Sequence, residues 1–242
     1  MAKFIKKSSH LEQQYRSSQH RSLRFGLLSL LGLFITAAGI APQQPVLLVV
    51  GLCWFTVCMM LTLLPVRNLS SLKAGIRGEQ SGADLLQSLP DSYLCLQNAT
   101  VPYRGKESET DLIVAGPTGV FIIEVKNRNG HITGDAEDKN WVQHKVGRAG
   151  GEYESAFYNP TKQVGTHIYR LAHYLRERGC RVHIDGAVLF PNPETTLSLS
   201  GEKEIPVFSG KNAGKDLLDH IRRGDDLPPE TVRQIRSLLA KL

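Results

Sequence analysis

Two acidic residues and a lysine near the middle of the chain stand in an order that could support hydrolytic chemistry. Glu124 and Lys126 are two positions apart in a β-like run, so both side chains would point to the same face of a sheet. Asp111 precedes them across the turn signal Gly116-Pro117-Thr118-Gly119. A two-residue loop would place Asp111 opposite Glu124. A bulged turn with Gly119 in the left-handed region would instead shift that register by one residue.

Two carboxylates side by side at a strand end favour a bound cation, because close like charges repel each other unless a cation lies between them. Oxygen ligands favour Mg²⁺ or Mn²⁺ over zinc. Such a cation would lower the pKa of a bound water and offset charge on a phosphate, while Lys126 could orient the water or stabilise the transition state. Taken alone, however, Glu-x-Lys is more often a solvated strand edge or a surface ion pair. The residues by themselves therefore leave both interpretations open.

The elements that must position these residues begin near residue 70. A helix is predicted from Ser70 or Ser71 to about Leu89, and Pro90 ends it. Three strands are predicted next, and the continuously apolar run Val120–Ile123 is typical of a central strand covered on both faces. The expected strands are about Tyr93–Pro102, Thr110–Ala115 and Val120–Lys126, followed by a hairpin around His131–Thr133 and Trp141–His144.

The second half of the chain continues the α/β pattern. Asn159 and Pro160 open a helix that runs to about Arg178 and ends at Gly179. Further strands are expected at about Arg181–Phe190 and Pro206–Phe208, with helices at about Ala213–Arg222 and Pro229–Leu242. This order predicts an α/β fold in which a mixed sheet is flanked by helices.

Two apolar runs precede this domain and predict a transmembrane helical hairpin over residues 25–65. Phe25–Ala41 and Val46–Leu64 contain no charged residue, and their 17 and 19 residues would span about 25 and 28 Å of a hydrocarbon core about 30 Å thick. Only Pro42-Gln43-Gln44-Pro45 separates them. The first run could instead be a secretory signal, or both runs could be core helices of a soluble protein. Because the two charge-free runs are so close together, the hairpin is the preferred interpretation.

The charge distribution predicts how the hairpin is oriented. Residues 1–24 form a basic tail with six basic residues and one acidic residue, whereas the remaining 218 residues carry a net charge of only +1. Basic residues also follow the second run at Arg67, Lys73 and Arg77, and the connecting turn has none. Cationic flanks stay in the cytoplasm, so both termini are expected there, with the spans in a bacterial inner or plasma membrane. Four cysteines without a CxxC pair favour reduced thiols over a zinc site.

The ordered set of motifs resembles a known family. Asp111 and Glu124-Val125-Lys126 across a hairpin resemble the PD-(D/E)xK nuclease superfamily, and the fuller pattern resembles its NERD (nuclease-related domain) branch. The landmarks that match this branch in order are Gly75-Ile-Arg-Gly78-Glu79, Asp111, the Gly-Pro-x-Gly turn, Glu124-Val-Lys126, Gly130-x-Ile132, Trp141 and Asn159-Pro160-x-x-Gln163. The resemblance covers residues 70–180 and implies a restriction-endonuclease-like fold, with residues 181–242 completing or extending the domain.

The resemblance also implies roles for individual residues. Asp111 and Glu124, together with the Val125 carbonyl, would bind Mg²⁺ or Mn²⁺, and Lys126 would be the catalytic lysine. Glu79 would be an accessory acid on the first helix, and Gln163 would lie near the site. Related nucleases often carry tyrosine four residues after the glutamine, where this chain has His167. That histidine is expected to be a partly exposed helix residue, and Trp141 a packing residue.

The expected function is that of a membrane-anchored, divalent-metal-dependent nuclease acting on DNA in preference to RNA. The alternative is a non-catalytic scaffold that keeps the fold and holds nucleic acid or a protein partner at the membrane. The near-neutral charge of residues 25–242 favours this alternative modestly, because a nuclease must attract a polyanion. Glycine-rich spans could also pack into a homo-oligomer through the hairpin.

Overall fold

The computed structural model describes residues 1–40, 44–146, 150–202 and 204–242, with the side chain of Arg67 left out. The chain forms two compact units, which are described separately. One unit comprises residues 9–76, and the other comprises residues 1–8 together with residues 77–242.

The larger unit contains a six-stranded mixed sheet, as the α/β prediction requires. Its antiparallel centre is β2, β3 and β4, while β1, β8 and β10 add parallel strands. Every residue of β4 is buried, which confirms the expected central strand. The strand order is β1 (Lys3–Lys6), β2 (Leu94–Tyr103), β3 (Lys106–Gly116), β4 (Gly119–Val125), β8 (Ile184–Leu189) and β10 (Val207–Phe208).

A second sheet differs from the single sheet that was predicted. The expected hairpin forms, since His131 pairs with His144, but it belongs to a separate four-stranded sheet. Two of its strands lie at the sheet edges and have short sequence signals: β7 is mostly exposed, and β9 has only two leucines that alternate with polar residues. The strand order is β7 (Glu152–Tyr158), β6 (Asn140–Val146), β5 (Gly130–Asp135) and β9 (Thr195–Ser200).

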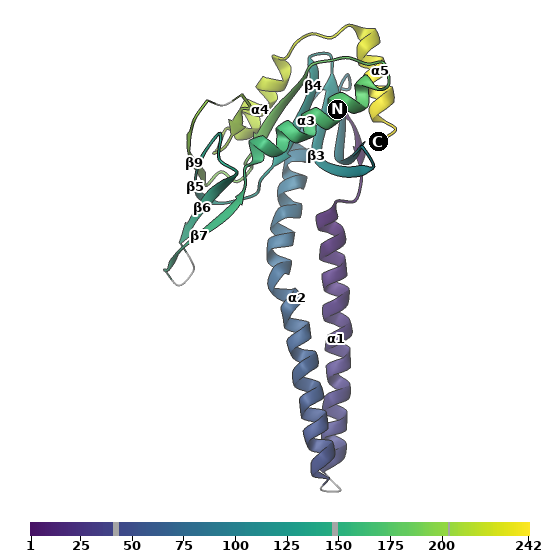
Figure 1. Cartoon of the computed structure of the whole chain (residues 1–242), viewed down its shortest axis with the longest axis vertical. Coiled ribbons are helices and arrows are strands. Elements are labelled where there is room, and N and C mark those ends of the chain that lie inside the picture. Colours follow the sequence, from purple (N-terminus) through teal and green to yellow (C-terminus); the bar gives the residue numbers. More distant parts are fainter. Residues whose placement is uncertain (41–43, 147–149, 203) are drawn as a thin grey trace. The chain divides into compact units, whose positions relative to one another are not determined.

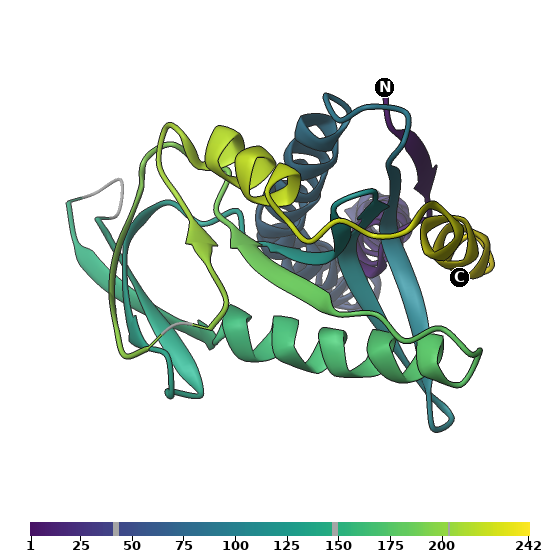
Figure 2. The ribbon, with the colours of Figure 1, turned by 90° about the horizontal axis from the view of Figure 1, so that it is seen from above.

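Helices cover both faces of the six-stranded sheet. The apolar residues of α3 (Pro160–Arg176) and α5 (Pro229–Leu239) pack into one core, which includes Ile113 and Ile122 of the sheet. The end of α2 (Pro45–Leu86) and α4 (Ala213–Arg222) pack into the other core, on the opposite face. Figure 2 shows α3 along one side of the strands and α4 on the other.

The N-terminal cap of α3 is as predicted and is firmly held. Asn159 is fully buried, and its side-chain oxygen accepts a hydrogen bond from the Thr161 N–H at 3.0 Å. Its amide group donates to the carbonyl of Asp138 at 2.8 Å and to that of Ala136 at 3.1 Å. The cap therefore fixes where α3 begins and ties it to the second sheet.

The smaller unit contains most of two long helices, α1 (His10–Ile40) and α2. Figure 1 shows two long helices, and both are long and apolar enough by composition to cross a membrane. The predicted turn lies partly outside the described residues, as does Ala41. The sequence predicts a new helix from Ser70 or Ser71, but α2 continues through Pro65 to Leu86 without a break. A single proline removes one backbone donor, and a long helix can accommodate this loss.

Glycine and serine residues line the contact between α1 and α2. The buried residues of α1 are Ser18, Ser29, Gly32 and Gly39. A Cβ atom at Gly32 would lie 2.7 Å from the Phe55 nitrogen, so the backbones could not approach as closely with a larger residue. The indole N–H of Trp54 donates to the Leu28 carbonyl at 2.9 Å. These contacts are those of a tightly packed helical hairpin.

The basic N-terminal segment contributes to two elements that were not predicted from the sequence. Residues Lys3–Lys6 form β1, which pairs in parallel with β2 from Leu94 to Gln97. The helix α1 then begins at His10, well before the apolar run. The first residues of the chain therefore belong to the same sheet that carries the candidate catalytic residues.

Candidate active site

The turn between β3 and β4 sets the register of the site. Gly116 pairs with Gly119 and Leu112 with Ile123, so the loop has two residues and the bulged alternative is absent. Gly119 has a φ of 131°, which a glycine adopts readily. Counting outward from Leu112 and Ile123 places Asp111 opposite Glu124. Both residues then lie on the face that α3 covers.

The acidic pair is anchored to the backbone of β4. The Val125 N–H donates to Asp111 Oδ2 at 2.8 Å, which holds this carboxylate against the neighbouring strand. Glu124 is almost fully buried, whereas Asp111 is half-buried. Val125 lies between Glu124 and Lys126, so its carbonyl stays a candidate ligand at the strand end. The three positions thus form one continuous stretch of the hairpin.

Lys126 links the acidic pair to α3. Its Nζ donates to Glu124 Oε1 at 2.5 Å and to Gln163 Oε1 at 3.1 Å. Gln163 lies in the first turn of α3, directly after the Asn159 cap. The structure therefore brings together four of the five residues predicted for catalysis: Asp111, Glu124, Lys126 and Gln163.

Burial changes the protonation of the two carboxyl groups. Burial, and then the proximity of Asp111, raises the pKa of Glu124 to about 8, although Lys126 opposes the shift. Burial also raises the pKa of Asp111, against the opposing effects of Lys126 and the Val125 N–H. With no cation present, the pair therefore retains a proton near neutral pH.

His167 is part of the same cluster, contrary to the expected partly exposed position. Its side chain is 6% exposed, and Nε2 lies 3.7 Å from Glu124 Oε2. Its Nδ1 is 3.2 Å from the hydroxyl of Ser108 and 3.3 Å from that of Thr110. Its spacing of four residues from Gln163 places both side chains on one face of α3, and this was the available sequence signal.

Glu79 lies on the helix that covers the other face of the sheet. It is buried on α2. A Cβ atom at the neighbouring Gly78 would clash with Asn127, just beyond the end of β4. Gly78 therefore allows α2 to approach the end of the strand that carries Lys126. Glu79 follows Gly78 on α2, so it lies on the helical turn that makes this approach.

Asn98 is a further unusual residue beside the site. It occupies the β2 position opposite Asp111 and has a φ of 57°, in the left-handed region. Its side-chain nitrogen donates to the Lys7 carbonyl at 3.1 Å. Asparagine tolerates this conformation better than most residues, so the identity of the residue fits the distortion. No sequence motif identified it.

The donor set fits a hard divalent cation completed by ligands from outside the protein. In the described part of the chain, no group of three or more His, Cys, Asp and Glu side chains is arranged to hold a metal. Within the same residues, however, Glu124 Oε2 is buried without a hydrogen-bond partner. An orphaned carboxylate oxygen calls for either a proton or a cation. Mg²⁺ commonly takes only one or two carboxylates and fills its remaining positions with water and phosphate.

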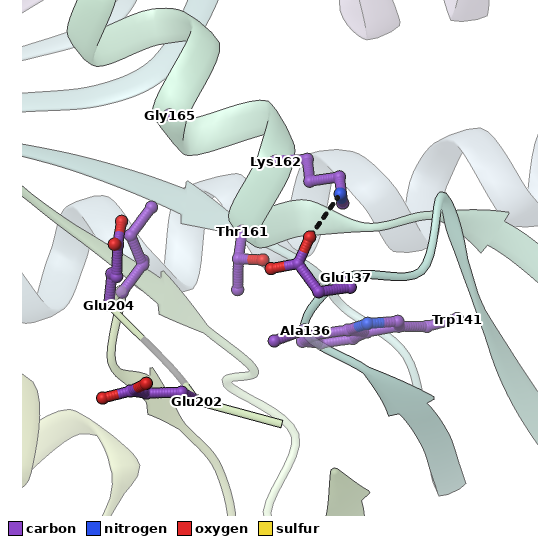
Figure 3. Close-up of a pocket in the computed structure, with 9 residues that line it drawn as sticks. Ala136, Glu137, Trp141, Thr161, Lys162, Gly165, Glu202 and Glu204 are labelled. Atoms are coloured by element: carbon purple, nitrogen blue, oxygen red, sulfur yellow. Dashed lines mark ion pairs between the residues drawn. The ribbon is translucent and has the colours of Figure 1, made fainter. Parts of the chain in front are cut away.

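A separate cavity lies beside the first turns of α3. Its volume is about 430 Å³, and Trp141, Lys162 and Glu137 are among its lining residues (Figure 3). Lys162 and Glu137 form an ion pair at 3.7 Å, and Trp141 is buried, as predicted for a packing residue. None of the predicted catalytic residues lines this cavity, so it is not the acidic site.

The sheet, its flanking helices and the acidic hairpin together define a nuclease-like α/β domain. Residues 74–191 match the family model of the nuclease-related domain (NERD), and this part of the chain belongs to that family. The match reaches past the predicted end at residue 180 and includes β8, the strand that pairs with β4.

One curated relative gives a further comparison. An uncharacterized protein of Bacillus anthracis is 36% identical over 96 residues, which cover 39% of this chain and 43% of the relative. The aligned part thus spans less than half the length of that protein. No solved structure matches the chain significantly.

Proposed function

We propose that this chain is a membrane-anchored, divalent-metal-dependent nuclease that hydrolyses phosphodiester bonds in DNA. The observation that carries the proposal is the contact between Lys126 and Glu124, one strand away from Asp111 on the same face. An acidic pair that can hold a cation, with an adjoining ammonium, is a donor set that can support phosphodiester hydrolysis. Membership of residues 74–191 in the nuclease-related family supports the same activity.

Each residue has a distinct task in this proposal. Asp111 and Glu124, with the Val125 carbonyl, would hold Mg²⁺ or Mn²⁺. The cation would supply a water of lowered pKa and positive charge beside the phosphate. Gln163 holds the Lys126 ammonium within reach of Glu124, where it can donate a hydrogen bond to a phosphate oxygen or a water. Glu79 is proposed as an accessory acid from α2.

We also propose that α1 and α2 anchor the domain in the lipid bilayer of a bacterial inner or plasma membrane, with both termini in the cytoplasm. Two apolar helices in succession and the basic flanks support this arrangement. The pairing of β1 with β2 independently supports the placement of both ends of the hairpin on one side, because one sheet cannot form from segments on opposite sides of a membrane.

The test is DNA cleavage by the full-length chain in detergent micelles. The full chain is needed because β1 completes the sheet edge beside β2. Supercoiled and linear DNA should be cut with Mg²⁺ or Mn²⁺ and left intact in EDTA. Asp111→Asn should lower the rate by about 10²-fold or more, because it removes one anionic ligand of the cation.

A matched control is Asp138→Asn, an exposed acid outside the site that should cut at the wild-type rate. The rival function is a scaffold, which the near-neutral charge of residues 25–242 favours. DNA binding without cleavage at any cation concentration, unchanged by Asp111→Asn, would establish the scaffold and reject the nuclease. RNA cleaved faster than DNA would correct the substrate.

A further inference from the structure

His167 and Glu124 present two orphaned polar atoms to each other. Neither His167 Nε2 nor Glu124 Oε2 has a hydrogen-bond partner within the described residues, and both side chains are more than nine-tenths buried. Their separation of 3.7 Å is too long for a hydrogen bond. A native interior rarely leaves two such atoms unsatisfied side by side, so the space between them is suited to a ligand.

The other nitrogen of the ring shows how His167 is held. Nδ1 lies within hydrogen-bond distance of the Ser108 and Thr110 hydroxyls on β3. If Nδ1 carries the proton and donates to one of these hydroxyls, the Nε2 lone pair faces Glu124. This is the usual arrangement of a metal-ligating histidine, in which a second partner fixes the ring through its other nitrogen.

The distance between His167 and Glu124 is close to that of two ligands of one cation. Two ligands at about 2.1 Å from one octahedral cation lie about 3.0 Å apart when adjacent and about 4.2 Å apart when opposite. The observed 3.7 Å lies between these two separations, so a relative shift of about 0.7 Å would bring Glu124 and His167 to adjacent positions around one cation.

We propose that His167 is a nitrogen ligand of the cation held by Glu124, and that this ligand makes the site prefer Mn²⁺ to Mg²⁺. The inference rests on the proposed function, because it requires a cation at Glu124. Magnesium strongly prefers oxygen ligands, whereas a first-row transition ion accepts imidazole together with carboxylate. His167 thereby determines which cation the site selects.

The test is pulsed electron paramagnetic resonance of Mn²⁺ bound to the untagged full-length chain, with isothermal titration of Mn²⁺ and Mg²⁺. The wild-type spectrum should show nuclear modulation from a directly bound nitrogen. His167→Gln should abolish that modulation, weaken Mn²⁺ binding by about tenfold or more, and change Mg²⁺ binding less. His144→Gln, on β6 in the second sheet, should leave both the spectrum and the affinities unchanged.

The outcomes separate this inference from the proposed function. Mn²⁺ that binds in a Glu124-dependent way without nitrogen modulation would overturn the ligand role of His167 and leave the nuclease proposal intact. Failure of the wild-type chain to bind Mn²⁺ or Mg²⁺ would overturn both. A wild-type spectrum without nitrogen modulation overturns the ligand role of His167 by itself, so the proposal stays falsifiable even where His167→Gln does not fold.

Discussion

At the scale of single residues, the site is dominated by the cost of burying two acids together. Glu124 is 1% exposed, and its neighbours include a second carboxyl group as well as an ammonium. The ammonium of Lys126 offsets part of this cost, but the pKa of Glu124 still rises to about 8. The folded chain therefore holds a proton that an unfolded chain would release.

This proton predicts how stability depends on pH when no cation is present. The pKa of Glu124 rises from its ordinary 4.5 to about 8 on folding, so the folded state binds the proton more tightly. Its contribution to stability is full below pH 4.5 and is lost as the pH rises to about 8. In EDTA at pH 8, Glu124→Gln should therefore raise the melting temperature by about 2–4 °C or more.

The comparison of the two proteins must be made across pH. Near pH 4.5 the wild type and Glu124→Gln should melt at similar temperatures, because both then carry a neutral side chain at this position. If the melting temperatures of the wild type and Glu124→Gln differed by the same amount from pH 4.5 to pH 8, folding would not raise the pKa of Glu124.

The sequence was a good guide to the residues of the hairpin and a poor guide to those that reach them from elsewhere. The pairing of Asp111 with Glu124 follows from strand parity and a short turn, both of which are local. The contact of His167 with Glu124 joins residues far apart in the chain, and it depends on how α3 lies on the sheet. No local pattern in the sequence encodes that placement, so the prediction that His167 is a partly exposed helix residue was wrong.

At the scale of elements, α3 must lie close to the sheet to bring Gln163 and His167 to the site. Gly186 on β8 makes this approach possible, since a Cβ atom there would clash with Val164 and lie 2.8 Å from Ile168 Cδ1. Gly186→Val should therefore displace α3, destabilise the domain by about 1–3 kcal/mol, and lower the cleavage rate more than tenfold. Denaturant unfolding and DNA cleavage measure the two effects.

A glycine on the same helix supplies the control for this prediction. Gly165 has open space around it, so Gly165→Ala adds no clash and should stabilise α3 by up to about 1 kcal/mol. Its cleavage rate should equal that of the wild type. If Gly186→Val and Gly165→Ala had the same free energy of unfolding and the same cleavage rate, the close approach of α3 to the sheet would not be required for stability or cleavage.

The hairpin offers a second prediction at this scale. A Cβ atom at Gly51 would clash with both the backbone nitrogen and the hydroxyl of Thr36 on α1. Gly51→Leu should therefore separate α1 from α2 and lower the melting temperature of the full chain in detergent. Gly26→Leu, at a position with open space, should have little effect. The idea of a tightly packed helix pair fails if both variants melt like the wild type.

The elements that the sequence did not predict share a physical cause. β7 is a short edge strand with mostly exposed residues and no regular apolar alternation. β9 is also a short edge strand, and although Leu197 and Leu199 alternate with serines, that signal covers only a few residues. β1 has only four residues, and it depends on pairing with β2 near the middle of the chain. The buried strands and capped helices were predicted because burial and caps leave a pattern in the sequence.

At the scale of the whole molecule, the pairing of β1 with β2 constrains the proposed membrane topology. The two strands precede and follow the hairpin in sequence but belong to one sheet, so both ends of the hairpin must lie on the same side. Reporter proteins fused separately to Met1 and Leu242 should therefore both report the cytoplasm. One cytoplasmic and one external terminus would contradict either the hairpin or the β1–β2 pairing.

The central claim is that Asp111, Glu124 and Lys126 form one metal-dependent phosphodiesterase site. The most direct measurement is the single-turnover rate of DNA cleavage by the full-length wild type and by Lys126→Ala, with cation binding measured on both. Removing the ammonium should lower the rate by about 10²–10³-fold while Mn²⁺ still binds. Cleavage that survives in Lys126→Ala at the wild-type rate, or a wild type that binds Mn²⁺ and DNA without cutting, would contradict the claim.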